Sequence, residues 1–255
     1  MPDALRLAYV TAFLARCRAT ASPRAALVEH PGLCGGQPAG EDGRVRLLVL
    51  DDCAIDELHE LLSCARTGIV SVFPSAPRSA ELVARELGWK RESVTPMVCR
   101  DLSDVPALGL PPELTVRAVR RLDSDPSDGV PLADAVAVAM QAQRDTDEPY
   151  AALADHLRAM PSAIKLFAAT DDGGVPHATS GCGVFGPEAN VLFVNTEPGW
   201  RERGIGSAMT AVALRAARLS GAERASLDAS DAGVSIYSRL SFQSLAPITR
   251  FVCVR

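Results

Sequence analysis

The sequence predicts an α/β protein built from two consecutive domains. In residues 113–255, short alternating apolar runs typical of strands are interspersed with runs of helical periodicity. A shorter series of the same kind occupies residues 44–99. Between them lies SDVPALGLPPEL, residues 103–114, which holds three prolines and neither periodicity. We therefore predict domains at 1–103 and 113–255, joined by a proline-rich linker.

The composition narrows the class of protein and its partners. Apolar residues make up 47% of the 255 residues, so a hydrophobic core is available. The net charge of −5 argues against a nucleic-acid surface, which needs a basic stripe. No apolar run reaches the roughly 18 residues of a membrane span, so no membrane partner is expected. Seven cysteines without a CxxC pair indicate reduced, buried thiols and no metal site.

The N-terminus has to be distinguished from a signal peptide. Residues 7–15 are fairly apolar, and residues 19–21 imitate a cleavage site. Asp3 and the arginines at 16 and 18 argue against secretion. One helical face instead carries Leu5, Tyr9, Ala12 and Phe13. We predict an amphipathic helix and a cytoplasmic protein.

The second domain should contain strands at 114–119, 164–170, 178–185, 191–196, 225–229 and 248–254. Helices are expected at 131–143, 150–160, 207–219 and 234–240. The strands 164–170 and 178–185 flank a DDGG turn and should form an antiparallel hairpin.

The first domain resembles a partial repeat of the second. Strands are expected at 44–50, 68–73 and 95–99, and helices at 55–66 and 78–87. The loop after the first of these strands is DDCAID, whose three carboxylates would repel a phosphate. Ala84 stands where the second domain has Tyr237. A degenerate domain that packs against or shapes its partner is therefore expected.

The segment TEPGWRERGIGSAM, residues 196–209, places glycines and arginines between a strand and a helix, as anion-binding loops do. A P-loop is excluded because the segment has no lysine. A dinucleotide turn fits poorly, because Gly204 follows the strand too late and Met209 replaces the third small residue. A glycine-rich helix entrance with solvated arginines is the plainest alternative.

The segment resembles the cofactor signature of the GNAT family of N-acetyltransferases. Arg201, Gly204 and Gly206 fill its three defined positions, with Pro198 and Trp200 where the family commonly has them. Further on, SIYSRLSF (235–242) is similar to the family's tyrosine segment, and Tyr237 matches its tyrosine. The resemblance covers most of 113–255. It implies a mixed, mostly antiparallel sheet flanked by helices, here as two tandem GNAT-like domains.

The resemblance also implies an activity, namely direct acetyl transfer from acetyl-CoA, as cosubstrate, to a primary amine. Main-chain amides would wrap the coenzyme A pyrophosphate, in a loop made of Arg201, Glu202, Arg203, Gly204, Ile205, Gly206 and Ser207. Strands 191–196 and 225–229 would splay apart, and Val194, Asn195 and Thr196 would hold pantetheine and the acyl carbonyl. Tyr237 would protonate the leaving thiolate. An ordinary packed tyrosine is the alternative for Tyr237.

Several positions depart from the family pattern. Ser230 stands where an asparagine often contacts coenzyme A, and Ser241 replaces a glycine before Phe242. Asn190 occupies the position of a glutamate base, and neither Glu188 nor Glu197 is assigned as base. No partner is identifiable for any of the four histidines, at 30, 59, 156 and 177.

The acceptor stays open between small-molecule and protein amines, and a homodimer stays open as the assembly. Acids in the expected acceptor region, Asp145, Asp147 and Glu148, suit a cationic amine or simply a solvated helix end. A non-catalytic acyl-CoA-binding regulatory module is the alternative function.

Overall fold

A computed structural model of the chain describes residues 2–20, 26–37, 44–120, 129–142 and 164–253. The chain folds into two compact units. The first unit comprises Met1–Val98, Asp228–Val234 and Gln243–Arg255, and the second comprises Cys99–Leu227 and Ser235–Phe242. No helix in these described ranges combines the length and the apolar character of a membrane span.

The sheet of the first unit has the strand order β1-β2-β3-β4-β13-β5. Its strands are β1 (Ala26–His30), β2 (Leu33–Gln37), β3 (Arg44–Val49), β4 (Thr67–Val72), β5 (Lys90–Cys99) and β13 (Ile248–Cys253). Only β3 and β4 pair in parallel, and the short β12 (Gln243–Ser244) adds to β5. The predicted strands of this half are confirmed, whereas the β1–β2 hairpin was not predicted.

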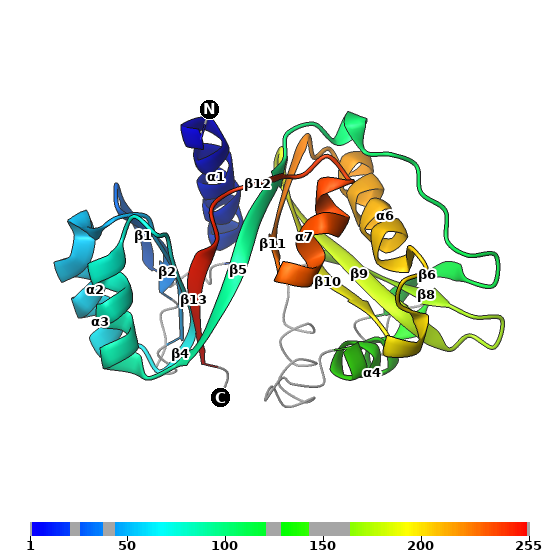
Figure 1. Ribbon diagram of the computed structural model, residues 1–255, viewed down its shortest axis with the longest axis horizontal. Coiled ribbons are helices and arrows are strands. Elements are labelled where there is room, and N and C mark those ends of the chain that lie inside the picture. Colours follow the sequence, from blue (N-terminus) through cyan, green and yellow to red (C-terminus); the bar gives the residue numbers. More distant parts are fainter. Residues whose placement is uncertain (1, 21–25, 38–43, 121–128, 143–163, 254–255) are drawn as a thin grey trace. The chain divides into compact units, whose positions relative to one another are not determined.

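Helices cover both faces of this sheet (Figure 1). On one face, α2 (Ile55–Ser63) and α3 (Pro77–Leu87) bury Leu58 and Val83 against Leu47 and Phe251. On the other face, α1 (Pro2–Thr20) packs a separate apolar cluster against Leu48, Val94 and Ile248. The residues predicted for the inward face of this helix, Leu5, Tyr9, Ala12 and Phe13, are all buried.

The acidic loop after β3 has a structural role. Asp51 accepts a hydrogen bond from the Cys53 N–H at 2.9 Å and caps the 3-10 turn η1 (Asp52–Ala54). Asp52 accepts bonds from the N–H and hydroxyl of Ser79 at 2.8 and 2.7 Å, in the first turn of α3. Carboxylates in these positions satisfy free amides and interact favourably with the helix dipole.

The second unit has the strand order β11-β10-β9-β8-β6-β7. Its strands are β6 (Thr115–Arg120), β7 (Val130–Pro131), β8 (Ile164–Thr170), β9 (Pro176–Phe185), β10 (Glu188–Thr196) and β11 (Arg224–Ala229). The predicted β8–β9 hairpin is antiparallel, as are the β6–β8 and β9–β10 pairs, whereas β10 and β11 run in parallel.

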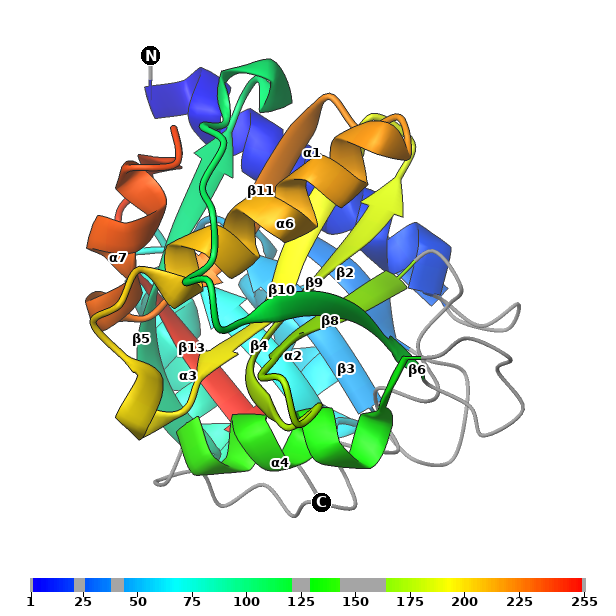
Figure 2. The ribbon, with the colours of Figure 1, turned by 90° about the vertical axis from the view of Figure 1, so that its right-hand side faces the viewer.

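Helix α6 (Ile205–Leu219) lies across β8, β9 and β10, and α4 (Leu132–Ala142) contacts β9 and β10 (Figure 2). Ile205 and Met209 of α6 are buried against Ala169 and Ala178 of the sheet. Short elements complete the unit: η2 (Leu102–Asp104), η3 (Pro198–Trp200) and α7 (Asp231–Ser238), which continues from the first unit. The helix expected at 150–160 lies outside the described residues.

The last strand does not follow the domain limits expected at 1–103 and 113–255. β13 pairs with β4 on one side and β5 on the other, so its hydrogen bonds join it to the first unit. Strand pairing is decided by backbone groups that meet in space, which the order of elements along the chain does not specify. A mixed, mostly antiparallel architecture is nevertheless the one predicted.

Candidate functional site

The glycine-containing loop leads directly into the N-terminus of α6. Gly204 has φ 75 and Glu202 has φ 63, so the backbone is left-handed at both residues. The first α6 hydrogen bond recorded at this end runs from the Ala208 N–H to the Gly204 carbonyl, 3.0 Å. The N–H groups of residues 205–207 therefore precede the first intrahelical donor, Ala208, and have no carbonyl partner one turn back in the helix. Gly204 supplies no capping side chain, which leaves this helix end suited to an anion.

The two glycines are required for different reasons. At Gly204 a side chain would meet nothing within 4 Å, but its φ of 75 lies where L residues are strained. Gly206 has no such φ, and a Cβ there would touch Thr196 Oγ1 at 3.7 Å and Ile236 Cδ1 at 4.0 Å, which are ordinary contacts. The protein itself therefore tolerates alanine at 206. An open backbone at Gly206 is useful to a ligand that approaches it closely.

Both arginines of the loop contact protein groups. Arg201 donates from Nε to the Thr196 carbonyl at 3.2 Å and from Nη2 to the Ala142 carbonyl at 2.6 Å. Arg203 pairs with Glu113 and lies over the Trp200 ring, 4.6 Å from its centroid. Both side chains thus hold the shape of the loop. The remaining guanidinium N–H groups add positive charge to it.

Strand β10 continues beyond its ladder with β11 before the loop begins. The parallel β10–β11 ladder, between strands described in full, consists of pairs from Glu188↔Arg224 to Asn190↔Ser226, while β10 continues to Thr196. On its other edge the pairing with β9 shifts register between Leu192 and Asn195, and Phe193 has φ 58. A bulge of this kind redirects a strand. The end of the ladder fits the predicted separation of the two strands.

The predicted pantetheine-contacting residues lie around this bulge. Val194, Asn195 and Thr196 form the end of β10, and Asn195 donates to Thr179 Oγ1 at 3.3 Å. The Thr179 hydroxyl in turn donates to the Phe193 carbonyl at 2.9 Å. Backbone groups on the β11 side of this segment lie beyond the parallel ladder, so an extended ligand can pair with them as an additional strand does.

His177 supports the start of the loop, a role that the sequence did not reveal. Its Nδ1 lies 2.7 Å from Glu197 Oε2, and its Nε2 lies 3.0 Å from Asp171 Oδ2. Its ring stacks on Trp200 with centroids 4.3 Å apart and 20° between the planes. Arg203, His177 and Trp200 thus form a stacked group, called here the His177 stack. The expectation that no histidine has an identifiable partner is wrong at this position, because Asp171 and Glu197 come from separate turns.

The two carboxylates change the protonation of this histidine. Burial disfavours the imidazolium, but hydrogen bonds to Asp171 and Glu197 outweigh it and raise the pKa of His177 above its ordinary value. A raised folded-state pKa means that protonation stabilises the fold. This contribution is fully present below the unfolded pKa of about 6.5, and it is lost as pH rises through the folded pKa.

We expect His177→Gln to destabilise the protein most at mildly acidic pH and progressively less as the pH rises. Glutamine occupies a similar volume but cannot carry the charge between two carboxylates. Thermal unfolding of both proteins across the neutral range measures the difference. A difference that is constant with pH would contradict a charged His177.

Comparison with known proteins gives the fold its name. No family model matches the sequence, and no curated protein matches it. Among solved structures, a GCN5-related N-acetyltransferase from Kribbella flavida is similar over 98% of this chain and 96% of that one, with a TM-score of 0.63 and 19% identity. A GCN5-related N-acetyltransferase from Sphaerobacter thermophilus covers 98% and 92%, with a TM-score of 0.56 and 15% identity.

A third solved structure decides how the two halves are related. It is a tandem GNAT protein from the clavulanic acid biosynthesis pathway, similar over 98% of this chain and 95% of that one, with a TM-score of 0.54 and 15% identity. This chain has the tandem GNAT fold. The resemblance seen in the sequence is confirmed at the level of the fold, and so is the predicted arrangement as two tandem GNAT-like domains.

Tyr237 lies in α7, at the position predicted from the GNAT tyrosine segment. Its ring meets Phe242 edge-on, with centroids 6.1 Å apart. Burial raises the pKa of Tyr237 to about 12, so the hydroxyl keeps its proton across the neutral range. Ser241 has φ 66, a left-handed conformation that glycine adopts more easily. This explains why the GNAT pattern places a glycine there, and it shows that serine is accommodated.

The other positions singled out beside the GNAT motif are engaged within the protein. Ser230 directly precedes α7 in the first unit, and its carbonyl accepts from the Gly233 N–H at 2.8 Å. Asn190 is buried and donates to the Ser226 carbonyl at 3.2 Å. Glu188 is buried and paired with Arg224 at 2.8 Å. Glu188 and Glu197, the two glutamates considered as bases, are therefore both paired with side chains of the protein. The acids at 145, 147 and 148 lie outside the described residues.

The cysteines differ from expectation in their exposure. All seven are free thiols. Cys17, Cys34, Cys99 and Cys182 are buried as predicted, whereas Cys53 and Cys64 are exposed. Within the described ranges, no three metal-ligating side chains come together.

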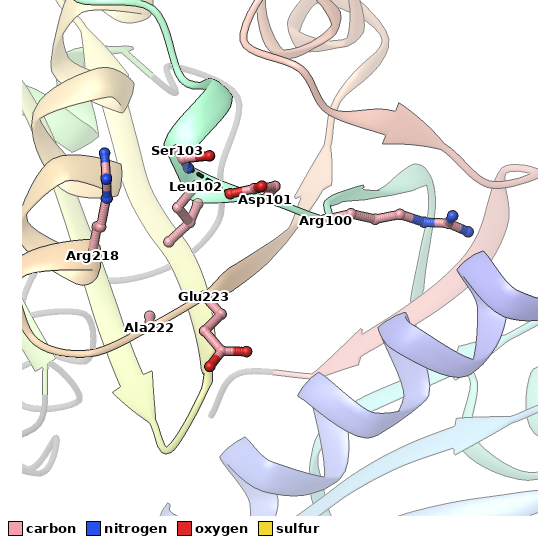
Figure 3. Close-up of a pocket in the computed structure, with 7 residues that line it drawn as sticks. All are labelled: Arg100, Asp101, Leu102, Ser103, Arg218, Ala222 and Glu223. Carbon is pink, nitrogen blue, oxygen red and sulfur yellow. Dashed lines mark hydrogen bonds between the residues drawn. The ribbon is translucent and has the colours of Figure 1, made fainter.

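A separate hollow of about 390 Å³ lies in the second unit between η2 and the end of α6 (Figure 3). Arg100, Arg218, Asp101 and Glu223 contribute balanced charges to it. The Asp101 carboxylate accepts a hydrogen bond from the Ser103 N–H at 2.8 Å, and the Leu102 N–H donates to the Glu223 carbonyl at 3.0 Å. None of the predicted site residues lines this hollow.

Proposed function

We propose that the protein is an acyl-CoA-dependent N-acyltransferase that moves an acetyl group from acetyl-CoA to a primary amine. The observation that carries the proposal is Gly206. Neither its φ nor its surroundings require glycine, yet it stands at an uncapped helix N-terminus inside a loop that matches the GNAT signature. A ligand that presses against the main chain, such as the coenzyme A pyrophosphate, accounts for it.

The same segment supports the placement of the rest of the cofactor. Beyond the end of the β10–β11 ladder, the backbone of Val194–Thr196 is suited to pair with the amides of pantetheine. The thioester would then lie beside β10. A main-chain N–H of this segment would stabilise the negative charge that develops on the carbonyl oxygen.

The transfer step needs a neutral amine. Its lone pair attacks the thioester carbonyl carbon, a C–N bond forms and the C–S bond breaks. The nitrogen gives up its proton to water, and the sulfur leaves as a thiolate that takes a proton from water. We propose that the Tyr237 hydroxyl donates a hydrogen bond to the departing sulfur. A phenol with a pKa of about 12 is a weaker acid than a thiol of pKa about 8.5, so it assists while the bond breaks and is not itself left ionised.

Acetyl-, propionyl- and succinyl-CoA are the ligands that test this proposal. Acetyl-CoA at a hundredfold excess over its Kd is expected to stabilise the protein by roughly 3 kcal/mol. Thermal unfolding measures this, and thiol release with a panel of amines measures transfer. Stabilisation by acetyl-CoA, with no thiol released from it in the presence of any amine, would favour the non-catalytic acyl-CoA-binding module. The absence of both would overturn the proposal. The free thiols are consistent with a cytoplasmic enzyme.

A further inference from the structure

The cofactor loop, residues 201–207, has a backbone conformation that needs support from the rest of the second unit. Glu202 has φ 63 and Gly204 has φ 75, and a left-handed conformation costs free energy in a residue other than glycine. Such conformations persist where the surrounding structure fixes them. The proposed phosphate contacts depend on where the N–H groups of the loop point. The side chains that hold the loop therefore influence how tightly it binds.

The segment that leads into the cofactor loop is attached to His177 in three ways. The Glu197 N–H donates to the His177 carbonyl at 2.9 Å, and the Glu197 carboxylate lies 2.7 Å from Nδ1 of the ring. The Trp200 ring stacks on the imidazole, with centroids 4.3 Å apart. Glu197 and Trp200 are themselves joined across η3, because the Trp200 N–H donates to the Glu197 carbonyl at 2.9 Å. His177, on β9, thus fixes the residues directly before Arg201.

Both ring nitrogens of His177 face carboxylates. Nδ1 lies 2.7 Å from Glu197 Oε2, and Nε2 lies 3.0 Å from Asp171 Oδ2. A neutral imidazole has one N–H donor and one lone pair, whereas an imidazolium has two N–H donors. Only the imidazolium can therefore donate to both carboxylates at once. In the neutral form one carboxylate would face a lone pair, and these two groups would repel each other.

Other charged groups surround the His177 stack, and the argument has to include them. In the described part of the chain, the elements around His177 carry six more charged side chains: Glu113, Arg117, Asp172, Arg201, Glu202 and Arg203. Arg203 pairs with Glu113, while the ring nitrogens of His177 lie against Asp171 and Glu197. Burial disfavours the imidazolium, but the hydrogen bonds to these two carboxylates outweigh burial and raise the pKa of His177.

We propose that the charged form of His177 positions the cofactor loop, so that coenzyme A binds more tightly while His177 is an imidazolium. His177 is a positioning residue, because it acts through Glu197 and Trp200. The inference rests on the proposed function in one respect, namely that the loop binds coenzyme A. Linkage is reciprocal, so coenzyme A should in return favour protonation of His177.

The expected pH dependence follows from the sign of this linkage. Coenzyme A affinity should be highest below the folded-state pKa of His177, and it should fall as the pH rises through that pKa. The fall should be about fivefold, the difference between a hydrogen bond with a charged donor and one with a neutral donor. A phosphate of the ligand also titrates near about pH 6. Variants are therefore compared with the wild type at the same pH, where the protonation of the ligand cancels.

Asp171→Asn separates the charge of His177 from its contacts. An asparagine amide can donate to Nε2 while the neutral ring donates from Nδ1 to Glu197. Asparagine Oδ1 can still accept from the Val175 N–H, as Asp171 Oδ1 does at 2.9 Å. The neutral ring then has both hydrogen bonds, so the loop should stay in place at every pH. Calorimetric titration should show Asp171→Asn binding coenzyme A about fivefold more tightly than the wild type at about pH 9, and equally tightly at about pH 6.

Two further variants complete the test. Asp172→Asn removes the same charge from the neighbouring residue of the same turn, and as the matched control it should follow the wild-type profile. His177→Gln cannot donate to both carboxylates as an imidazolium does. Its affinity relative to the wild type should therefore be lowest at acidic pH, and the two affinities should converge as the pH rises.

The outcomes distinguish this inference from the proposed function. If the affinity ratio between Asp171→Asn and the wild type is the same at every pH, charge on His177 does not position the loop. If the wild type binds no coenzyme A at any pH, the proposed function fails, and the loop is then measured directly. At one alkaline pH, the amides of residues 201–207 should exchange hydrogen more slowly in Asp171→Asn than in the wild type. Equal exchange would remove the positioning role of His177.

Discussion

Replacing Gly206 by aspartate is expected to abolish coenzyme A binding, with a loss of affinity of about a thousandfold, or ~4 kcal/mol. The carboxylate would stand at the helix end where the pyrophosphate is proposed to lie, and like charges at contact distance repel strongly. The side chain has room within the protein, since a Cβ at this position meets only ordinary contacts. Calorimetric titration with coenzyme A measures the loss, and unfolding temperature reports whether the fold survives.

Gly206→Ala makes the test sharper, because its two effects should point in opposite directions. Alanine favours a helix over glycine by about 1 kcal/mol, so the unfolding temperature should stay the same or rise. The added methyl group would nevertheless obstruct a ligand that touches the backbone, so affinity should fall about tenfold. Gly199→Ala is the matched control, since its Cβ would meet nothing within 4 Å and it lies before the loop amides. Unaltered affinity in Gly206→Asp would show that the anion does not lie at this helix end.

Tyr237→Phe is expected to lower turnover about a hundredfold, the scale of one lost hydrogen-bond donor to charge that develops in the transition state, and to leave coenzyme A affinity nearly unchanged. Phenylalanine retains the ring that packs edge-on against Phe242, so only the hydroxyl is lost. Steady-state thiol release gives turnover, and titration with coenzyme A gives affinity.

The separation between these two quantities identifies the role of the hydroxyl. A loss that is confined to turnover indicates an interaction made as the thiolate leaves. Turnover equal to that of the wild type would remove Tyr237 from the mechanism. A fall in affinity as large as the fall in turnover would instead make the hydroxyl a binding group.

The His177 stack and the contacts of Asp228 with Tyr9 and Arg250 show what sequence reasoning could not provide. Glu197 and Asp171 come from turns on either side of His177, and only the β8–β9 and β9–β10 pairings bring all three together. Tyr9 and Arg250 lie near opposite ends of the chain, and both bond to Asp228 because α1 packs on the sheet in which β13 inserts between β4 and β5. A sequence pattern does not predict such contacts, because they depend on which strands pair.

By contrast, the sequence by itself determined the local elements and the candidate cofactor loop. Alternation predicted strands such as β8 and β9, helical spacing predicted α1 and α6, and two glycines with their flanking residues marked the helix entrance at 204–206. These features depend on backbone preferences and on burial of one face, both of which are set by neighbouring residues. The tertiary structure alone decided where β13 pairs, which groups Asp52 accepts hydrogen bonds from and which charges surround Asp228. Those outcomes arise from hydrogen bonds and charges between residues that are distant in sequence, and folding is what brings such residues into contact.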